Sequence, residues 1–292
     1  MEFRILGRPD VYHNGQRLDI GAPKQRVVLA ALLLGTDQTL STDRLVESVW
    51  WHPPAAAGAN LRGYLAGLRR ALRVPGERES RLRTVRGGGY QLTVLPGELD
   101  LDRFQELADQ GGQALRAGRM PEAAERLEQA LRLWRGRALD GVVCGPALQA
   151  KAAWLDERRL TVAEQWAQVQ LGLGRPENVV TELRGLVTEH PLRERLWAYL
   201  MLALTRAGRP GEALAAYADL RAVLARELGT DPGPELRQLY QRILHGPDRV
   251  AEHDGSRTGA DRVEAGAART SGRHEPAAGS PRAGCDPHPV RR

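Results

Sequence analysis

Residues 60–73 carry arginines at a spacing that could bind nucleic acid. On a helix of 3.6 residues per turn, the leucines at 61, 65, 68 and 72 fall on one face, and Arg62, Arg69 and Arg73 fall on the opposite face. One side is therefore suited to packing and the other is cationic. A guanidinium group can bind guanine O6 and N7 with two hydrogen bonds, or it can clamp a phosphate. The pattern favours recognition of DNA.

A short basic hairpin is expected after this helix. Arginines stand at 81, 83 and 86, Gly87-Gly88-Gly89-Tyr90 follow, and residues 82–94 alternate as in paired strands. Arg83 or Arg86 would suit contact with phosphate or with the minor groove. A basic helix followed by a glycine-tipped β-ribbon is typical of a winged helix-turn-helix, which lays the helix in a DNA groove.

Further candidates lie outside this segment. Lys24-Gln25-Arg26, at the start of an earlier helical pattern, is either a solvated surface cluster or a contact to the DNA backbone. The full set of residues expected to bind DNA is Arg62, Tyr64, Arg69, Arg70, Arg73, Arg83, Arg86, Lys24 and Arg26.

The charge distribution supports this interpretation. The net charge of the 292-residue chain is +6, and residues 1–97 hold 14 Lys or Arg against 8 Asp or Glu. The excess of positive charge therefore lies in the N-terminal third. A basic patch confined to one part of a chain is the electrostatic signature of a nucleic-acid binder.

Enzyme chemistry finds no support in the sequence. No phosphate-binding loop of the Gly-x-x-x-x-Gly-Lys-Ser/Thr type and no Gly-x-Ser-x-Gly motif occurs. The seven histidines are scattered, and none within a folded segment has the spacing to another His or Cys that a zinc site needs. Tryptophans 134, 154, 166 and 197 fall in helical patterns and are interpreted as core. We expect no catalytic residue, no metal and no cofactor.

The elements that would position the arginines can be read from residues 1–97. Apolar residues around Asn14-Gly15 predict short strands with a tight hairpin. Helices are expected from Pro23, from a cap at Ser41 or Thr42, and over about 55–72, where Pro75-Gly76 ends the last one. The expected fold of residues 1–97 is an α+β winged helix-turn-helix, with a small β-sheet, three helices and a C-terminal hairpin.

Residues 98–246 are predicted to be all-helical. Amphipathic runs cover 101–117, 121–134, 147–171, 176–189, 192–207, 210–228 and 233–245. A Gly-Arg turn recurs at 118, 174 and 208, and the last two copies are 34 residues apart, the tetratricopeptide period. We therefore expect stacked helix pairs of the tetratricopeptide (TPR-like) type.

Residues 247–292 contain no Leu, Ile, Met or aromatic residue and are predicted to be a disordered tail. Cys144 and Cys285 lie far apart in the sequence, which fits a reducing cytoplasm. No membrane span and no signal peptide is expected, so the predicted location is the cytoplasm, at the nucleoid.

The chain also resembles a known family. Its N-terminal part is similar to an OmpR-type winged helix, and its helical part to a bacterial transcriptional activator domain. The segments that carry the resemblance are Gly21-Ala-Pro-Lys-Gln-Arg-Val-Val-Leu-Ala-Ala-Leu-Leu-Leu34, Leu68-Arg-Arg-Ala-Leu72, Gly89-Tyr90, Glu227-Leu-Gly229 and Asp231-Pro-Gly-Pro-Glu-Leu236. Together they resemble the Streptomyces antibiotic regulatory protein (SARP) family, in its small-type form.

The resemblance implies an activator of secondary-metabolite genes. Such a protein would bind direct repeats near promoters as a homodimer on double-stranded DNA and would recruit RNA polymerase. One departure from the family pattern is that Gly63 and Gly67 enter the DNA-contacting helix, where each glycine costs about 1 kcal/mol of helix stability relative to alanine. An alternative is therefore a protein- or ligand-binding scaffold whose winged helix is weakened.

Overall fold

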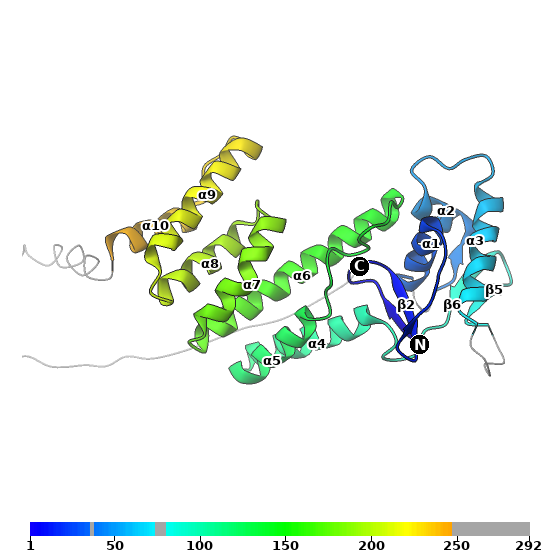
Figure 1. Ribbon diagram of the computed structural model, residues 1–292, viewed down its shortest axis with the longest axis horizontal. Coiled ribbons are helices and arrows are strands. Elements are labelled where there is room, and N and C mark those ends of the chain that lie inside the picture. Colours follow the sequence, from blue (N-terminus) through cyan, green and yellow to red (C-terminus); the bar gives the residue numbers. More distant parts are fainter. Residues whose placement is uncertain (36–37, 74–79, 247–292) are drawn as a thin grey trace, which may run out of the picture. The chain divides into compact units, whose positions relative to one another are not determined.

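The computed structural model describes residues 1–35, 38–73 and 80–246 (Figure 1). The predicted disordered tail, residues 247–292, lies outside the described residues. The N-terminal part combines short strands with three helices. They are β1 Glu2–Arg4, β2 Asp10–His13, β3 Gln16–Arg17, α1 Pro23–Leu33, β4 Leu40–Ser41, α2 Thr42–Val49, α3 Ala57–Ala71, β5 Leu82–Val85 and β6 Gly89–Leu92.

The strands form two small antiparallel sheets of three strands each. The first has the order β1-β2-β3, and Asn14 and Gly15 turn between β2 and β3 with positive φ angles of 50° and 78°. The second has the order β4-β6-β5, so that β6 pairs with β5 and also with β4, where Leu40 lies opposite Tyr90. The N-terminal strands and the hairpin at 82–94 confirm the prediction, whereas β4 was not predicted.

The three N-terminal helices start where their sequences favour it. Pro23 occupies the first turn of α1, where its missing N–H costs nothing. Ser41 caps α2, because its Oγ accepts a hydrogen bond of 3.2 Å from the main-chain nitrogen of Arg44. Apolar side chains of all three helices are buried in one core. This packing fixes α3 on α1 and α2.

The helical part follows the predicted runs within three residues at every helix end. Its helices are α4 Asp100–Arg116, α5 Met120–Leu131, α6 Pro146–Gly172, α7 Pro176–Glu189, α8 Glu194–Arg206, α9 Pro210–Leu228 and α10 Pro234–His245. Each of α5, α6, α7, α9 and α10 has a proline in its first two positions. In the described residues no helix is both long and apolar enough to cross a membrane.

The recurring Gly-Arg turn closes the first helix of each pair in the same way. Gly118, Gly174 and Gly208 have φ angles of 73°, 71° and 73°, which favour glycine. The arginine that follows each glycine donates its main-chain N–H to a carbonyl five residues back, at 2.8–3.0 Å. This is the Schellman ending of a helix. The repeat seen in the sequence therefore corresponds to three helix pairs, α4–α5, α6–α7 and α8–α9.

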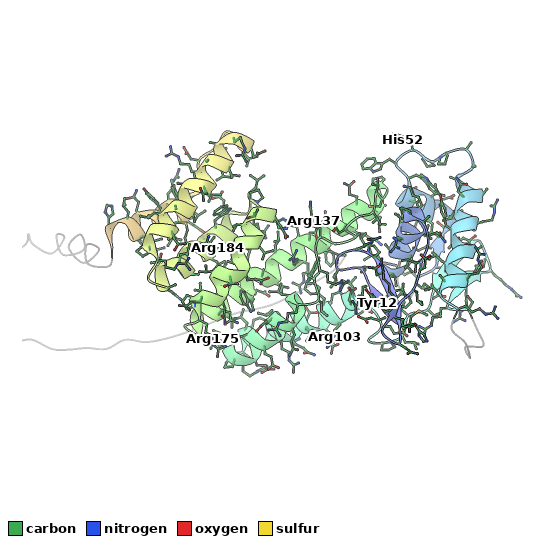
Figure 2. All side chains as sticks on the ribbon, in the orientation of Figure 1. Tyr12, His52, Arg103, Arg137, Arg175 and Arg184 are labelled. Carbon is green, nitrogen blue, oxygen red and sulfur yellow. The ribbon has the colours of Figure 1, made fainter. Side chains whose placement is uncertain are left out.

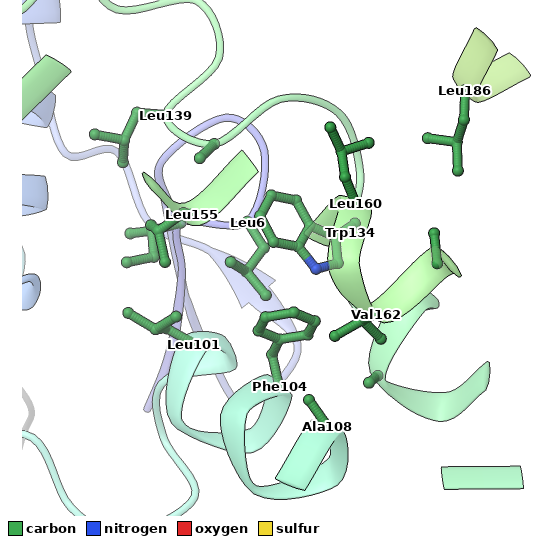
Figure 3. Close-up of a cluster of buried hydrophobic side chains, with 14 of the residues drawn as sticks. Leu6, Leu101, Phe104, Ala108, Trp134, Leu139, Leu155, Leu160, Val162 and Leu186 are labelled. Carbon is green, nitrogen blue, oxygen red and sulfur yellow. The ribbon is translucent and has the colours of Figure 1, made fainter. Parts of the chain in front are cut away.

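The N-terminal segment packs into the helical part. The main-chain nitrogen of Phe3 donates a hydrogen bond to the carbonyl oxygen of Glu98. The carbonyl oxygens of Leu6 and Ile5 accept hydrogen bonds from the main-chain nitrogens of Arg135 and Leu139, respectively. Figure 3 shows the Leu6 side chain among Phe104, Trp134 and other apolar residues of the helical part. The predicted boundary at 97/98 stays a prediction, and one apolar core extends across it.

Asp100 is a buried acceptor at this junction. Its carboxylate accepts hydrogen bonds from the main-chain nitrogens of Ile5 and Leu6 at 2.9–3.1 Å, and Arg135 Nη2 lies 2.9 Å from its Oδ2. Burial raises the pKa of Asp100 above its ordinary value of 3.8, and the hydrogen bonds from Ile5, Arg135 and Leu6 oppose that rise. One carboxylate thus satisfies donors from both parts of the chain.

A second contact joins α2 to the start of α6. The main-chain nitrogen of Gly145 donates a hydrogen bond of 2.7 Å to the carbonyl oxygen of Ser48. Lys24 Nζ donates to the carbonyl oxygens of Val49 and Val143, at 2.7 and 3.2 Å. Gly145 has ordinary extended angles, but a Cβ there would lie 2.0 Å from the carbonyl oxygen of Glu47. Glycine is therefore required by close approach of two main chains.

Replacing Gly145 by alanine should destabilise the protein by about 1–3 kcal/mol, because main chain rather than a mobile side chain must give way. The midpoint of urea unfolding measures this loss. Gly172→Ala, at the other end of α6, is the control, since a Cβ there meets nothing within 4 Å. An unchanged midpoint for Gly145→Ala would show that α2 and α6 separate without cost.

Candidate nucleic-acid interface

Helix α3 presents the cationic face that the sequence predicts. Leu61, Leu65 and Leu68 are fully buried against the N-terminal core. Arg62 and Arg70 are exposed, and so is Arg73 just past the helix. In the described residues the side chains of these arginines have neither a hydrogen-bond nor an ion-pair partner. Figure 1 shows α3 and the β5–β6 hairpin on the side of the N-terminal part that is turned away from α4 and α5.

Arg69, which the helical spacing groups with Arg62 and Arg73, has partners on the hairpin. Its Nε donates to the carbonyl oxygen of Leu82 at 3.1 Å, and its Nη2 donates to Thr84 Oγ1 at 2.6 Å. Its guanidinium also lies over the ring of Tyr90, 5.9 Å from the centroid. Arg69 therefore ties α3 to the hairpin, and Thr84 is a supporting residue that the sequence reasoning missed.

The hairpin is the wing. Gly87 and Gly88 turn at its tip with φ angles of 101° and 97°. Arg83 and Arg86 are exposed, and Arg83 Nη2 donates to Thr93 Oγ1 at 3.2 Å. At the base of β6, a Cβ on Gly89 would lie 2.3 Å from Thr39 Cγ2 and 3.0 Å from the oxygen of Leu40. Glycine at 89 thus lets β6 pair closely with β4, and this pairing holds the wing beside α3.

Lys24, Arg26 and Tyr64 all have partners within the protein. Lys24 Nζ reaches main-chain oxygens of α2 and of the segment before α6. Arg26 Nη1 forms an ion pair of 2.8 Å with Asp10 and also donates to Pro9. Tyr64 stacks on Trp50 with ring centroids 6.2 Å apart. These contacts give the three residues a structural role, whereas their predicted contact with DNA is untested.

The two glycines of α3 have unlike surroundings. The helix continues through both of them. A Cβ on Gly63 would meet nothing within 4 Å, but one on Gly67 would lie 2.0 Å from Gln25 Nε2. Gln25 Oε1 also accepts a hydrogen bond from the main-chain nitrogen of Ala22, at the start of α1. Gly67 therefore makes room for a side chain that caps α1.

Gly63→Ala should raise stability by about 0.5–1 kcal/mol, because alanine favours the helix and finds open space. Gly67→Ala should bring no such gain, because Gln25 must leave its cap. Thermal unfolding of both variants measures the difference. In a Gln25→Ala background, Gly67→Ala should recover the helix gain, and equal effects of Gly67→Ala in both backgrounds would contradict this account.

Metal ligands do not gather near this surface. No group of three or more His, Cys, Asp or Glu with the geometry of a metal site occurs in the described part of the chain. His52, for example, projects from the loop between α2 and α3 (Figure 2).

Comparisons with known proteins place both parts of the chain. The family model described as "Transcriptional regulatory protein, C terminal" matches residues 16–92, and the one described as "Bacterial transcriptional activator domain" matches residues 99–244. The matches include α3 and the wing in the first part and almost the whole helical part in the second.

Two bacterial regulatory proteins are similar in sequence over most of this chain. Regulatory protein AfsR of Streptomyces coelicolor is 42% identical over 254 residues, which are 86% of this chain and 25% of that protein. Regulatory protein DnrI of Streptomyces peucetius is 37% identical over 251 residues, 84% of this chain and 92% of that protein. This chain thus spans a quarter of the length of AfsR and nearly all of DnrI.

A solved structure has the same architecture. It is Mycobacterium tuberculosis EmbR in complex with a low affinity phosphopeptide. The TM-score is 0.72 at 35% identity, over 84% of this chain and 65% of that chain. The winged helix followed by a helical part is therefore an arrangement that both proteins share.

Proposed function

We propose that this chain, which belongs to the Streptomyces antibiotic regulatory protein family of transcriptional regulators, is a sequence-specific activator of a secondary-metabolite gene cluster. The observation that carries the proposal is the surface formed by α3 and the wing. Its exposed arginines stand on elements whose apolar sides are buried, so the cationic groups are presented on a fixed frame.

Each arginine receives a role from its surroundings. Arg62, Arg70 and Arg73 are assigned to the DNA groove and its phosphates, because they are exposed and have no partner within the described residues. Arg83 and Arg86 are assigned to phosphate or minor-groove contact at the wing. Arg69 is assigned to positioning, because its side chain donates hydrogen bonds to Leu82 and Thr84 of β5. Lys24, Arg26 and Tyr64 are assigned to positioning for the same kind of reason.

The partners follow from the same surface. Two copies on a direct repeat would bind double-stranded promoter DNA side by side, as a homodimer on DNA, and the helical part would contact the second copy or RNA polymerase. A protein with these partners works at the nucleoid in the cytoplasm. The EmbR structure supports the architecture but not these partners, since EmbR is in complex with a phosphopeptide there.

Retention of genomic DNA tests the proposal. Purified protein is incubated with fragmented DNA of its own genome, and the retained fragments are sequenced. We expect promoter fragments that share a short direct repeat. A chain carrying Arg62→Ala, Arg70→Ala and Arg73→Ala, run in parallel, should lose that enrichment.

Retention without a shared motif would overturn sequence-specific binding. No retention at all would favour the alternative of a scaffold whose winged helix is weakened, with function residing in the helical part. In that case the wild-type and triple-variant samples would be indistinguishable.

A further inference from the structure

Lysine is rare in this chain, and both lysines bond across the junction between the winged-helix part and the helical part. Lys24 and Lys151 are the only lysines among its 42 Lys and Arg residues. Lys24, on α1, donates a hydrogen bond from Nζ to the carbonyl oxygen of Val143, in the segment before α6. Lys151, on α6, donates from Nζ to the carbonyl oxygen of Leu34, at the end of α1. Each ammonium group therefore links one part of the chain to the main chain of the other.

The carbonyl oxygens around Lys24 explain its position. Lys24 lies in the first turn of α1, where the positive end of the helix dipole disfavours a cation. Its Nζ donates at 2.7 Å to the carbonyl oxygen of Val49, the last residue of α2, where the helix dipole is negative. The carbonyl oxygen of Val143 is its second acceptor, at 3.2 Å. A compact ammonium group with three donors suits two acceptors from separate segments better than a planar guanidinium does.

Two ring contacts extend this link from Lys24 to α3. Lys24 Nζ lies over the ring of Trp50, 5.9 Å from its centroid. Trp50 directly follows α2 and stacks on Tyr64 of α3, with ring centroids 6.2 Å apart. Tyr64 stands two residues from the exposed Arg62. The contacts therefore form a continuous path from the main chain before α6 to the helix that carries the proposed DNA-binding arginines.

Lys151 provides the contrast at the same junction. It has the same charge as Lys24 and the same kind of acceptor, a main-chain carbonyl oxygen, at 3.2 Å. Within the described residues, however, its side chain has no hydrogen bond to α2 or α3. The two lysines therefore differ in whether their contacts continue to the DNA-binding surface.

We propose that Lys24, acting through Trp50 and Tyr64, couples the helical part to the position of α3 and is thereby a positioning residue for DNA binding. This inference rests on the proposed function, since it takes α3 as the DNA-binding helix. With Lys24 in place, its bond to the segment before α6 holds Trp50 and Tyr64, and α3 is presented in one position. Without the ammonium group α3 samples further positions, and only a fraction of the molecules is competent to bind DNA.

Hydrogen exchange of the DNA-free full chain, followed by mass spectrometry, tests the coupling. Lys24→Met keeps the length of the side chain but removes the ammonium group, and it should speed amide exchange in α3 about tenfold. Lys151→Met is the matched control, because it removes the same charge from the same junction and should leave exchange in α3 unchanged. Exchange in α3 that is the same in Lys24→Met as in the wild type, or an equal increase in both variants, would overturn the proposal.

Affinity for DNA provides the second readout, and the probe is the direct-repeat fragment that the wild-type protein enriches most in the retention experiment. Lys24→Met should weaken binding about tenfold, as residues that couple two sites do, whereas Lys151→Met should bind like the wild type. The slope of log affinity against log salt should stay unchanged, because the bound state keeps its phosphate contacts.

Two results of this titration would contradict a positioning role for Lys24. A salt slope smaller by about 0.9 would mean that Lys24 itself contacts a phosphate. Unchanged affinity, at a temperature where both proteins are folded, would mean that Lys24 contributes to stability alone.

A double-mutant cycle tests the path through the two rings. In a Tyr64→Leu background the path is already broken, so Lys24→Met should weaken DNA binding by less than about twofold. An equal loss of affinity in both backgrounds would show that Lys24 acts by another route and would overturn the proposal.

The two readouts separate this inference from the proposed function. If the wild-type protein retained no DNA, the proposed function would fail, and exchange in α3 would still decide whether Lys24 couples the two parts of the chain. If the wild type bound the direct repeat and Lys24→Met bound it equally well, the proposed function would stand and the positioning role of Lys24 would fail.

Discussion

Replacing Arg62, Arg70 and Arg73 together by alanine should weaken binding to operator DNA on the order of 100-fold near physiological salt. The three side chains are exposed on or beside α3 and have no partner in the described residues, so their removal costs the fold little. Each phosphate contact contributes about 0.9 to the slope of log affinity against log salt. Loss of three contacts should therefore reduce the slope by about 2.7.

A variant with the same change of charge controls for this experiment. Arg116, Arg175 and Arg237 are exposed on the helical part, and replacing all three by alanine removes the same three charges. Fluorescence anisotropy over a series of salt concentrations measures affinity and slope for both variants. If the two lost affinity equally, DNA would be attracted by total charge, and the assignment of α3 to the groove would be wrong.

Asp100→Ala should destabilise the protein by about 3–5 kcal/mol, the largest loss of stability we expect from one substitution. The main-chain nitrogens of Ile5 and Leu6 are buried and would lose their acceptor, and Arg135 would lose its ionic partner. The unfolding temperature should fall by roughly 10 °C for a folded unit of this size. Calorimetry or circular dichroism on heating measures the change.

Asp109→Ala is the matched control for this experiment, since Asp109 lies on the same helix and also forms an ion pair. That pair, with Arg158 at 2.8 Å, is on the surface, where the Asp109 side chain is 65% exposed. Its removal should cost no more than about 1 kcal/mol. Similar losses for both variants would mean that the buried hydrogen bonds of Asp100 contribute little beyond an ordinary surface contact.

The helices could be predicted because each is marked locally. Gly118, Gly174 and Gly208 stand where a left-handed residue ends a helix, and prolines open the next one. Strand β4 escaped prediction because it is two residues long and is defined by its pairing with β6, more than 45 residues away. A strand of that length has no alternation to detect.

The site could be predicted only as a set of arginines. Helical spacing placed Arg69 with Arg62 and Arg73, but the acceptors of Arg69 lie on β5 and become visible only when the hairpin is folded against α3. Lys24 and Arg26 are alike in this respect, because their acceptors come from other segments. Periodicity states which face a residue occupies, whereas its partners depend on contacts between distant segments.

The first six residues of the chain pack both in the winged-helix part and against the helical part. Phe3, Ile5 and Leu6 are fully buried, and their main-chain groups bond to residues 98, 100, 135 and 139. A fragment cut after residue 97 would expose these apolar side chains and orphan their amides. If helical parts were exchanged between relatives, the amino-terminal segment would likewise have to be exchanged together with the helical part that it contacts. The winged-helix part is therefore not an interchangeable module, and its evolution is constrained by the helices against which it packs.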